Sequence, residues 1–568
     1  MGDVFEYIVD GTSGLAPGAV DGKALMAGVC SKGETGKGYL LGKDSDLSGL
    51  LGSGPLVDCL RDYFAAAGQD AVMVAVPVQG SAYGQASPLK QQGPGAEAYV
   101  SGLPSANAEV TVKVRKAGLA GTANVDISLD GGLSYEFDAV DVPGNGILVL
   151  DIGCQLNFPT DISLVADTTY SFRTLLPVGP VTHKGQGPEV SAEGEPKAAA
   201  SVILQITKSG RVNQGQYRLS LDGGQSWDID RTLPLEGEII VGDSGVSITL
   251  PGGNAVMAGG DEYHFEVYAP VPSISAIMAA LDPPLELFNP ECIYIIGDTD
   301  ASDWAALGVL SEDLWNKHRP TIFVAHTRLP FAGEDMDDWV AWCLSERQQI
   351  SHRFVLVSSA FARVSDVRGQ AKVRNMIGLL AGRISNIPVM RAIGRVRDAA
   401  ISGAALPDNL REAHQKTLED AGYITAKRYA GLTGVYWGDA RTLAEPTSDY
   451  RYLEVLRVVF KGLRLARIAA LKSLYDEAGD PLATSGALGI NWLIANLHEA
   501  MSVMIKAVPQ ELAACEIEVP SGQDIVNNGL AVTLGFVGLP IIRSIKLYAY
   551  YTYAGSSFDA RLSERSVI

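Results

Sequence analysis

Two stretches in the middle of the chain repeat each other at an offset of 92 or 93 residues. The sequence SLDGGLSY at 128–135 recurs as SLDGGQSW at 220–227, and YSF at 170–172 recurs as YHF at 263–265. Upstream of both copies, apolar residues alternate with polar ones, which is the pattern of strands with one buried face. Asp-Gly-Gly between such strands favours a tight hairpin, because glycine readily adopts positive φ. The repeat therefore predicts a duplicated β-module.

The repeat divides the chain into two flanks and an insertion. We name residues 89–180 module 1 and residues 181–271 module 2, and expect each to be a β-sandwich. The remaining predicted units are an N-terminal arm at 1–20, an α/β core split between 21–88 and 272–390, a mixed helical and β C-terminal domain at 391–555, and a C-terminal arm at 556–568. The predicted fold class is thus a mixed α/β and α+β multidomain protein with a discontinuous α/β core.

Buried strands and amphipathic helices alternate in both flanks. A helix is predicted from Pro55 to Gly68, followed by a Val-rich strand at 72–76. After the modules, strands at 292–296, 321–325 and 354–357 alternate with helices at 303–317 and 336–349. This order indicates a parallel or mixed sheet, and we expect both flanks to supply strands to one sheet.

Three further local features follow from the flanking sequence. Pro283-Pro284 predicts a break in the chain before the strand at 292–296. Helices are expected to dominate from about residue 373 to 507, with a long helical stretch around 399–429. The chain is then predicted to finish in strands at 516–519, 531–536 and 541–553.

The formal charge of -20 argues against nonspecific nucleic-acid binding as the main task. Residues 91–180 hold 10 acidic and 4 basic residues, and residues 181–270 hold 12 and 6. The six cysteines show no CxxC pair, which indicates reduced thiols. The N-terminus has no signal-peptide pattern, and the longest uncharged run, 525–542, contains glycines and Pro540, so neither secretion nor membrane insertion is predicted.

Most segments that resemble catalytic or binding motifs lack residues that those motifs require. The segment 31–38 resembles a phosphate loop but lacks its first glycine and its Ser or Thr. Gly242-Asp243-Ser244-Gly245 resembles a serine-protease nucleophile but lies inside module 2. The seven histidines form no pair at metal-ligand spacing. Asp298, Thr299 and Asp300 follow a strand, yet they also suit a helix cap. We therefore predict no catalytic residue, cofactor or metal.

One predicted helix carries a row of cations. Arg457, Lys461, Arg464 and Arg467 lie at i, i+4, i+7 and i+10, and the opposite side of the helix is apolar. An ordinary solvated face would explain this row. In so acidic a protein, four cations without acidic i+4 partners also suit a docking surface for an acidic partner.

The flanks resemble the contractile tail sheath proteins of bacteriophages and related contractile injection particles. The resemblance rests on Gly54-Pro55-Leu56 through Val76, on the α/β segment 292–357, and on the closing segment IIRSIKLYAY at 541–550. The duplicated modules and the stretch around 399–429 depart from the commoner pattern, which indicates a divergent branch.

The resemblance implies a structural, non-enzymatic subunit that stacks as six-fold rings around an inner tube and contracts to drive the tube through a cell envelope. Terminal arms would add strands to neighbouring subunits, with the N-terminal arm formed by Val4, Phe5, Tyr7, Ile8 and Val9. The cationic row would contact the tube protein. The resemblance also implies baseplate and tail terminator proteins as partners. The protein would be assembled in the host bacterial cytoplasm and would form part of the virion tail.

Two alternatives remain open on sequence grounds. The first is a hydrolase-like α/β enzyme that uses Asp298 or Asp300 with His326 and carries the modules as carbohydrate-binding attachments. The second is a virion decoration or adhesion protein whose modules bind glycans through Tyr135, Trp227 and Tyr268. The alternation of these aromatics favours packing over binding.

Overall fold

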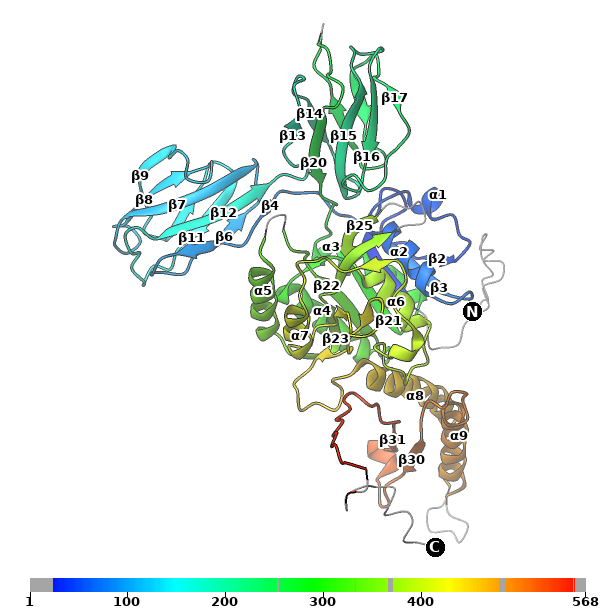
Figure 1. Cartoon of the computed structure of the whole chain (residues 1–568). Helices are drawn as coiled ribbons and strands as arrows, with labels where there is room; N and C mark the ends of the chain where they lie inside the picture. The colour runs from blue at the N-terminus through cyan, green and yellow to red at the C-terminus, as the bar shows by residue number, and fades with distance from the viewer. Residues whose placement is uncertain are drawn as a thin grey trace, which may run out of the picture.

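A central sheet, two β-modules and a helical C-terminal region make up the computed structural model of the chain (Figure 1). The structure describes residues 24–252, 255–331, 334–365, 371–479, 487–554 and 556. The predicted N-terminal arm at Val4 to Val9, and all of the predicted C-terminal arm except residue 556, lie outside the described residues.

The central sheet has seven strands in the order β2-β3-β1-β21-β22-β23-β29. Its five inner strands are parallel, and each edge strand is antiparallel to its neighbour. The strands are β1 (Ala24–Val29), β2 (Tyr39–Gly42), β3 (Val72–Val78), β21 (Cys292–Thr299), β22 (Ile322–Thr327), β23 (His352–Ser358) and β29 (Thr442–Leu443). Because β1 pairs with β21, the prediction that both flanks build one sheet is confirmed.

Helices cover both faces of this sheet. Alternate residues of each buried strand face opposite ways, so Met26 and Tyr294 join one hydrophobic cluster while Leu25 and Ile293 join the other. The helices of the sheet region are α1 (Leu47–Leu51), α2 (Pro55–Ala66), α3 (Ile274–Leu287), α4 (Ala301–Asn316), α5 (Met336–Gln348), α6 (Ile377–Ser385) and α7 (Glu412–Asp420). The helices predicted at 55–68, 303–317 and 336–349 are therefore present as α2, α4 and α5.

Helices α2 and α6 approach each other closely on one face. A Cβ atom at Gly378 would lie 2.4 Å from the carbonyl oxygen of Cys59, and one at Gly382 would lie 2.7 Å from the Cβ of Ala66. The two glycines, four residues apart, thus form a flat surface on α6. Any side chain at either position would force the helices apart.

Two local predictions in this region are wrong. Pro283 and Pro284 do not break the chain, because α3 runs through both. Burial of Leu281, Pro284 and Leu285 stabilises this helix despite the lost N–H donors. The stretch around 399–429 is not one long helix, since it contains α7 between β26 (Ala404–Ala405) and β27 (Ala426–Lys427).

Two small sheets complete the body. Strands β24 (Phe361–Ser365) and β25 (Ala371–Asn375) form a hairpin, to which β26 adds a third strand. Strand β27 pairs with β28 (Tyr436–Trp437). The β24–β25 hairpin lies on the side of the body that meets module 2 (Figure 1).

The two modules have matching strand orders. In module 1, β12-β7-β8-β9 form one sheet, with β4 and β5 on the other edge of β12, and β10-β11-β6 form a second. In module 2 the corresponding sheets are β13-β20-β15-β16-β17 and β14-β19-β18. One hydrophobic cluster fills each module. The boundaries proposed for the modules stay a prediction.

The strands of the modules have the following bounds. Module 1 and the segment leading into it contain β4 (Gln85–Ala86), β5 (Lys90–Gln92), β6 (Tyr99–Gly102), β7 (Ala108–Lys116), β8 (Asn124–Ser128), β9 (Phe137–Asp141), β10 (Ile147–Val149), β11 (Cys154–Asn157) and β12 (Thr169–Leu175). Module 2 contains β13 (Thr182–Lys184), β14 (Ser191–Gly194), β15 (Ala200–Lys208), β16 (Gln216–Ser220), β17 (Arg231–Thr232), β18 (Glu238–Ile240), β19 (Val246–Thr249) and β20 (Glu262–Val267).

The C-terminal region extends from the body on the side away from module 2 (Figure 1). It contains α8 (Leu453–Leu471), α9 (Leu488–Ile505), the short α10 (Ile525–Asn528), and a hairpin of β30 (Ala514–Glu518) and β31 (Thr533–Val537). The strands predicted at 516–519 and 531–536 correspond to β30 and β31. The strand predicted at 541–553 is not formed, because no strand of the described chain pairs with this segment.

Candidate assembly surface

The cationic row on α8 is not an exposed stripe, and that interpretation is wrong. Arg457 is 3% exposed, and its Nε lies 2.6 Å from Oε1 of Glu291, which is 4% exposed. Arg457 also donates to the carbonyl of Ile387 at 3.3 Å. Burial would lower the pKa of Arg457, but the adjacent Glu291 carboxylate more than offsets this and raises the pKa.

Two of the other three cations also turn inward. Lys461 Nζ lies 2.7 Å from a carboxylate oxygen of Glu511. Arg464 is buried and donates to the backbone carbonyls of Pro290 and Pro320. Only the fourth member of the row, Arg467, is exposed. Most of the row therefore fixes α8 to the body and to the segment before β30.

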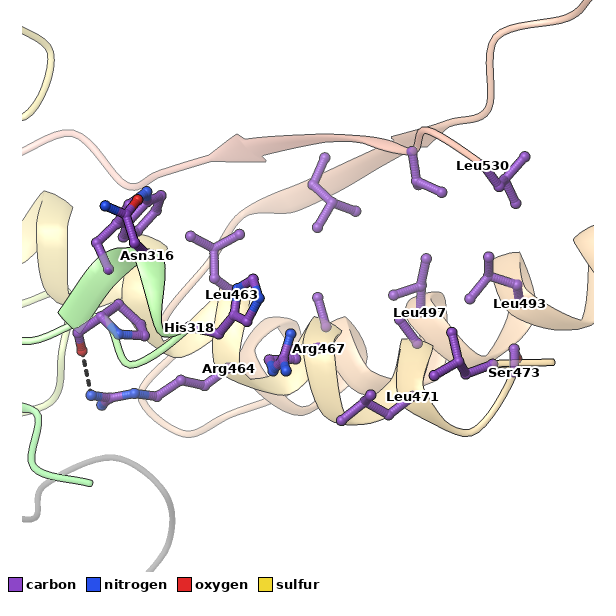
Figure 2. A pocket seen from close by; sticks show the side chains of 17 residues that line it. Asn316, His318, Leu463, Arg464, Arg467, Leu471, Ser473, Leu493, Leu497 and Leu530 are labelled. Carbon is purple, nitrogen blue, oxygen red and sulfur yellow. Dashed lines mark hydrogen bonds between the residues drawn. The ribbon is translucent and has the colours of Figure 1, made fainter. Parts of the chain in front are cut away.

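Next to Arg467 lies an apolar cavity of about 730 Å³ between α8, α9 and the strand that includes Leu534. Figure 2 shows leucines of both helices and of the β31 side pointing into it, while Arg464 reaches away to a carbonyl. The lining residues named in the figure are Asn316, His318, Leu463, Arg464, Arg467, Leu471, Ser473, Leu493, Leu497 and Leu530. The cavity shows that the hairpin and the two helices do not fill the space between them.

The segment that follows β31 is extended and exposed. Residues 538–553 have no helix or strand, and Leu547 and Tyr548 are 89% and 87% exposed. Its other large exposed apolar side chains are Leu539, Ile542, Ile545, Tyr550, Tyr551 and Tyr553. An exposed run of this length is unusual for a monomer and indicates a surface that another polypeptide covers.

One arginine ties this segment to the body. Arg543 Nε lies 2.9 Å from Asp439, its Nη2 contacts the buried carboxylate of Glu454, and its guanidinium lies 3.5 Å from the centroid of the Tyr452 ring. Burial raises the pKa of Glu454, although the cationic Arg543 opposes the shift. We name this set the Arg543 clamp. Sequence reasoning missed it, because Asp439 and Glu454 are 104 and 89 residues away in the chain.

The β30–β31 hairpin offers free sheet edges beside the exposed segment. In the described chain the hairpin forms a two-stranded sheet, and neither strand has a second neighbour. A two-stranded ribbon is marginal by itself, and its outer N–H and C=O groups are available for pairing. The C-terminal region thus combines an extended segment without a sheet and a sheet with open edges.

Of the candidate enzymatic residues, His326 and Asp300 contact the backbone, and Asp298 Oδ1 lies 4.0 Å from His326 Nδ1. Nε2 of buried His326 accepts from the N–H of Gly297 at 3.1 Å, and Nδ1 lies 3.0 Å from the Thr327 carbonyl. Burial lowers the pKa of His326, which keeps the ring neutral. Asp300 caps α4 through the N–H groups of Ser302 and Asp303. Both ring nitrogens of His326 thus contact backbone groups.

The other motifs also resolve into packing or turns. Ser244 is buried and donates to the carbonyl of Val241 at 2.7 Å, which makes the GDSG sequence a turn. Trp227 is half-buried under the guanidinium of Arg218, 4.4 Å from the ring centroid. Tyr135 is 37% exposed, and Tyr268 is half-buried.

Three further observations concern metals, disulfides and membranes. Within the described ranges, no group of three or more His, Cys, Asp or Glu side chains is arranged to hold a metal ion. All six cysteines are in the described part and are free thiols. Among the described helices, none combines the length and apolar character that a bilayer crossing requires.

The central sheet with its helices, the two β-modules and the C-terminal region together make this a multidomain, mixed α/β protein. The family model described as "DUF2586, N-terminal domain" matches residues 1–441, and the one described as "DUF2586, C-terminal domain" matches residues 449–556. The chain belongs to the DUF2586 family.

A curated relative supports the resemblance to tail sheath proteins. Over 135 residues the chain is 32% identical to the "Putative tail sheath protein" of Haemophilus phage HP1, a match that covers 22% of this chain and 36% of that protein. The chain thus spans about a third of the length of the curated relative that it matches. The resemblance to tail sheath proteins that the sequence indicated is confirmed.

Solved structures of sheath proteins are also similar at a low level. The sheath tail protein of Desulfitobacterium hafniense is 10% identical with a TM-score of 0.41, covering 95% of this chain and 100% of that chain. The sheath tail protein of Listeria innocua is 8% identical with a TM-score of 0.39, covering 93% and 97%. The helical sheath of the anti-feeding prophage in its contracted state is 16% identical with a TM-score of 0.35, covering 52% and 78%.

Proposed function

We propose that this protein is the structural subunit of a contractile tail sheath. The observation that carries the proposal is the exposed, extended segment 538–553. The Arg543 clamp ties this segment to the body of its own chain, and the segment follows a two-stranded sheet with open edges. The sheath relative and the family membership agree with this assignment. Each subunit would lend the segment to a neighbour, as strand addition does in other assemblies.

The side-chain pattern of the segment suits an added strand. In extended backbone, residues two apart share a face, so Ile541, Ile545, Leu547, Tyr551 and Tyr553 lie on one face together with Arg543, its one charged residue. The opposite face carries Ser544, Lys546 and Thr552 among its apolar residues. One face would pack on the neighbour's α8, α9 and hairpin layer, and main-chain hydrogen bonds would join the segment to an edge of β30–β31.

The remaining parts follow from the same proposal. Subunits would form six-fold rings stacked around an inner tube, and Val4, Phe5, Tyr7, Ile8 and Val9 would form a second inter-subunit arm. Tube contact through the α8 row would fall mainly to Arg467, since Arg457, Lys461 and Arg464 are engaged inside the chain. The acidic modules would lie on the outside, and the baseplate and tail terminator would bind the ends of the cylinder.

Contraction in this proposal requires no bound nucleotide. The extended lattice would be a trapped state, and the contracted lattice would bury more surface and release the difference as mechanical work. The protein would act in the virion, after assembly in the host cytoplasm, without contacting nucleic acid or membrane directly.

Electron microscopy of the purified full chain tests the proposal. Wild-type protein is expected to form hollow cylinders. Leu547→Asp places a charge on the apolar face of the segment and should abolish them, whereas Lys546→Asp changes the neighbouring residue on the other face and should not. Discrete monomers in the wild type at high protein concentration, or equal assembly of both variants, would contradict the proposal.

A further inference from the structure

Module 2 docks on the body through its repeated Asp-Gly-Gly turn. The carboxylate of Asp222, 5% exposed, accepts a hydrogen bond from the backbone N–H of Ala371 in the β24–β25 hairpin. The next residue, Lys372, donates from Nζ to the carbonyl of Ala199 at 2.9 Å. The first two residues of β25 thus supply a backbone N–H and an ammonium group to a site between the start of β15 and the Asp222 turn.

Module 1 contains the same turn at the repeat offset of 92 residues. Ser128 and Ser134 hold Asp130 at 2.8 and 2.6 Å, and Ser220 and Ser226 hold Asp222 at the same distances. The N–H of Gly131 donates to the Glu109 carbonyl at 2.7 Å, as that of Gly223 donates to the Ser201 carbonyl at 2.9 Å. The backbone that shapes the docking site is therefore present in both copies.

In module 1 the site at the equivalent turn is an open notch, whereas in module 2 it holds the start of β25. A cavity of about 270 Å³ is lined by Asn107, Glu109, Asp130, Arg173 and Pro180. Asn107, Glu109 and Asp130 are the repeat equivalents of Ala199, Ser201 and Asp222, which surround the docked hairpin in module 2. Among the described residues, none of the body donates a hydrogen bond to the Asp130 carboxylate. Hydrogen bonds from Ser134, Ser128 and the Leu133 backbone, all within the module, lower its pKa to about 2.

The charge of the notch suits the kind of group that fills its counterpart. Asp130 and Glu109 provide two carboxylates, and Arg173 lies 3.8 Å from Glu109 with both side chains substantially exposed. The module around it carries 10 acidic and 4 basic residues between 91 and 180. A cationic turn would find both local acceptors and a favourable long-range field.

We propose that this notch of module 1 is a docking site for a β-hairpin of a partner protein, which presents a lysine next to a backbone N–H group at the start of one strand. The hairpin of the same chain is already held by module 2, so the occupant comes from another polypeptide. The inference goes beyond the sheath proposal and does not depend on it.

A hairpin peptide supplies the probe. A cyclised, fluorescent peptide with the sequence of residues 361–375 reproduces the group that module 2 binds, and its binding to the intact chain is measured by fluorescence anisotropy. Saturable binding is expected, with at least a tenfold loss when Lys372 of the peptide is replaced by alanine. Asp130→Ala and Glu109→Arg in the chain should each weaken binding at least tenfold.

Two controls keep the result interpretable. Asp138→Ala removes an exposed carboxylate elsewhere in module 1 and should leave the affinity unchanged. Glu109→Arg changes an exposed rim residue, so it tests the notch even if Asp130→Ala unfolds the turn, which circular dichroism would reveal. Absence of binding, or binding insensitive to Glu109→Arg, would overturn the proposal. Loss of self-association in Glu109→Arg without peptide binding would assign the notch to a second copy and would also overturn it.

Discussion

Replacing Arg457 with leucine tests whether the cationic row on α8 belongs to the interior. The variant would leave the Glu291 carboxylate, which is 4% exposed, without its partner at 2.6 Å, and would remove a donor from the Ile387 carbonyl. Removing one member of a buried ion pair costs about 3–5 kcal/mol, because the remaining charge stays desolvated. The midpoint of the affected thermal transition should fall by about 6–20 °C, at roughly 2–4 °C per kcal/mol for a region of 150–250 residues.

Arg467→Leu on the same helix provides the matched control. Arg467 is exposed, so its removal should change stability by less than about 0.5 kcal/mol. The double variant Glu291→Gln with Arg457→Leu should recover more than half of the loss, since it removes both charges. Differential scanning calorimetry of the full chain measures all three. Equal midpoints for Arg457→Leu and Arg467→Leu would refute the buried pair and restore the exposed stripe.

Two other substitutions test the body of the protein by thermal unfolding. Gly382→Leu should destabilise the body by at least about 1–3 kcal/mol, because a Cβ atom there would lie 2.7 Å from the Cβ of Ala66. The control is Gly144→Ala in module 1, which should be neutral because a Cβ atom there meets no atom within 4 Å. Equal effects of the two substitutions would contradict the close α2–α6 contact. Asp303 has a pKa raised to about 6 by burial and then by Asp300, so the folded state gains stability as pH falls from above 6 toward the ordinary value of 3.8. Asp303→Asn should therefore raise the unfolding midpoint at pH 7.5 by about 1–3 °C and lose most of this gain at pH 4.5. The gain is small because the Asp303 side chain is partly exposed. The same gain at both pH values would contradict the raised pKa of Asp303.

Local pattern and long-range pairing differ in how far the sequence reveals them. The run at 72–76 and helix α2 were predictable, because buried strands and a Pro-initiated amphipathic helix depend on neighbouring residues. The joint sheet followed from finding the same strand type on both sides of the repeat. Helix α8 and its apolar face were equally visible in the periodicity.

The sequence did not reveal what α8's cations contact. Glu291 and Glu511 are 166 and 50 residues from their partners Arg457 and Lys461, so no helical spacing indicates them. The closing segment posed the opposite problem, because its period-2 pattern predicted a strand that has no partner strand in the described part of the chain. Hydrophobic periodicity predicts which face of a helix or strand a residue occupies. The groups that pack against that face are known only from the tertiary structure.

Cross-linking between isotopically distinct copies tests the central claim most directly. A photo-reactive phenylalanine analogue at position 550 is placed in heavy-labelled protein, which is mixed with light protein before assembly and irradiation. If the closing segment joins neighbouring subunits, the cross-links will connect heavy segments to light residues of the β30–β31 hairpin and α9. Cross-links confined to heavy–heavy pairs within one chain would contradict the account.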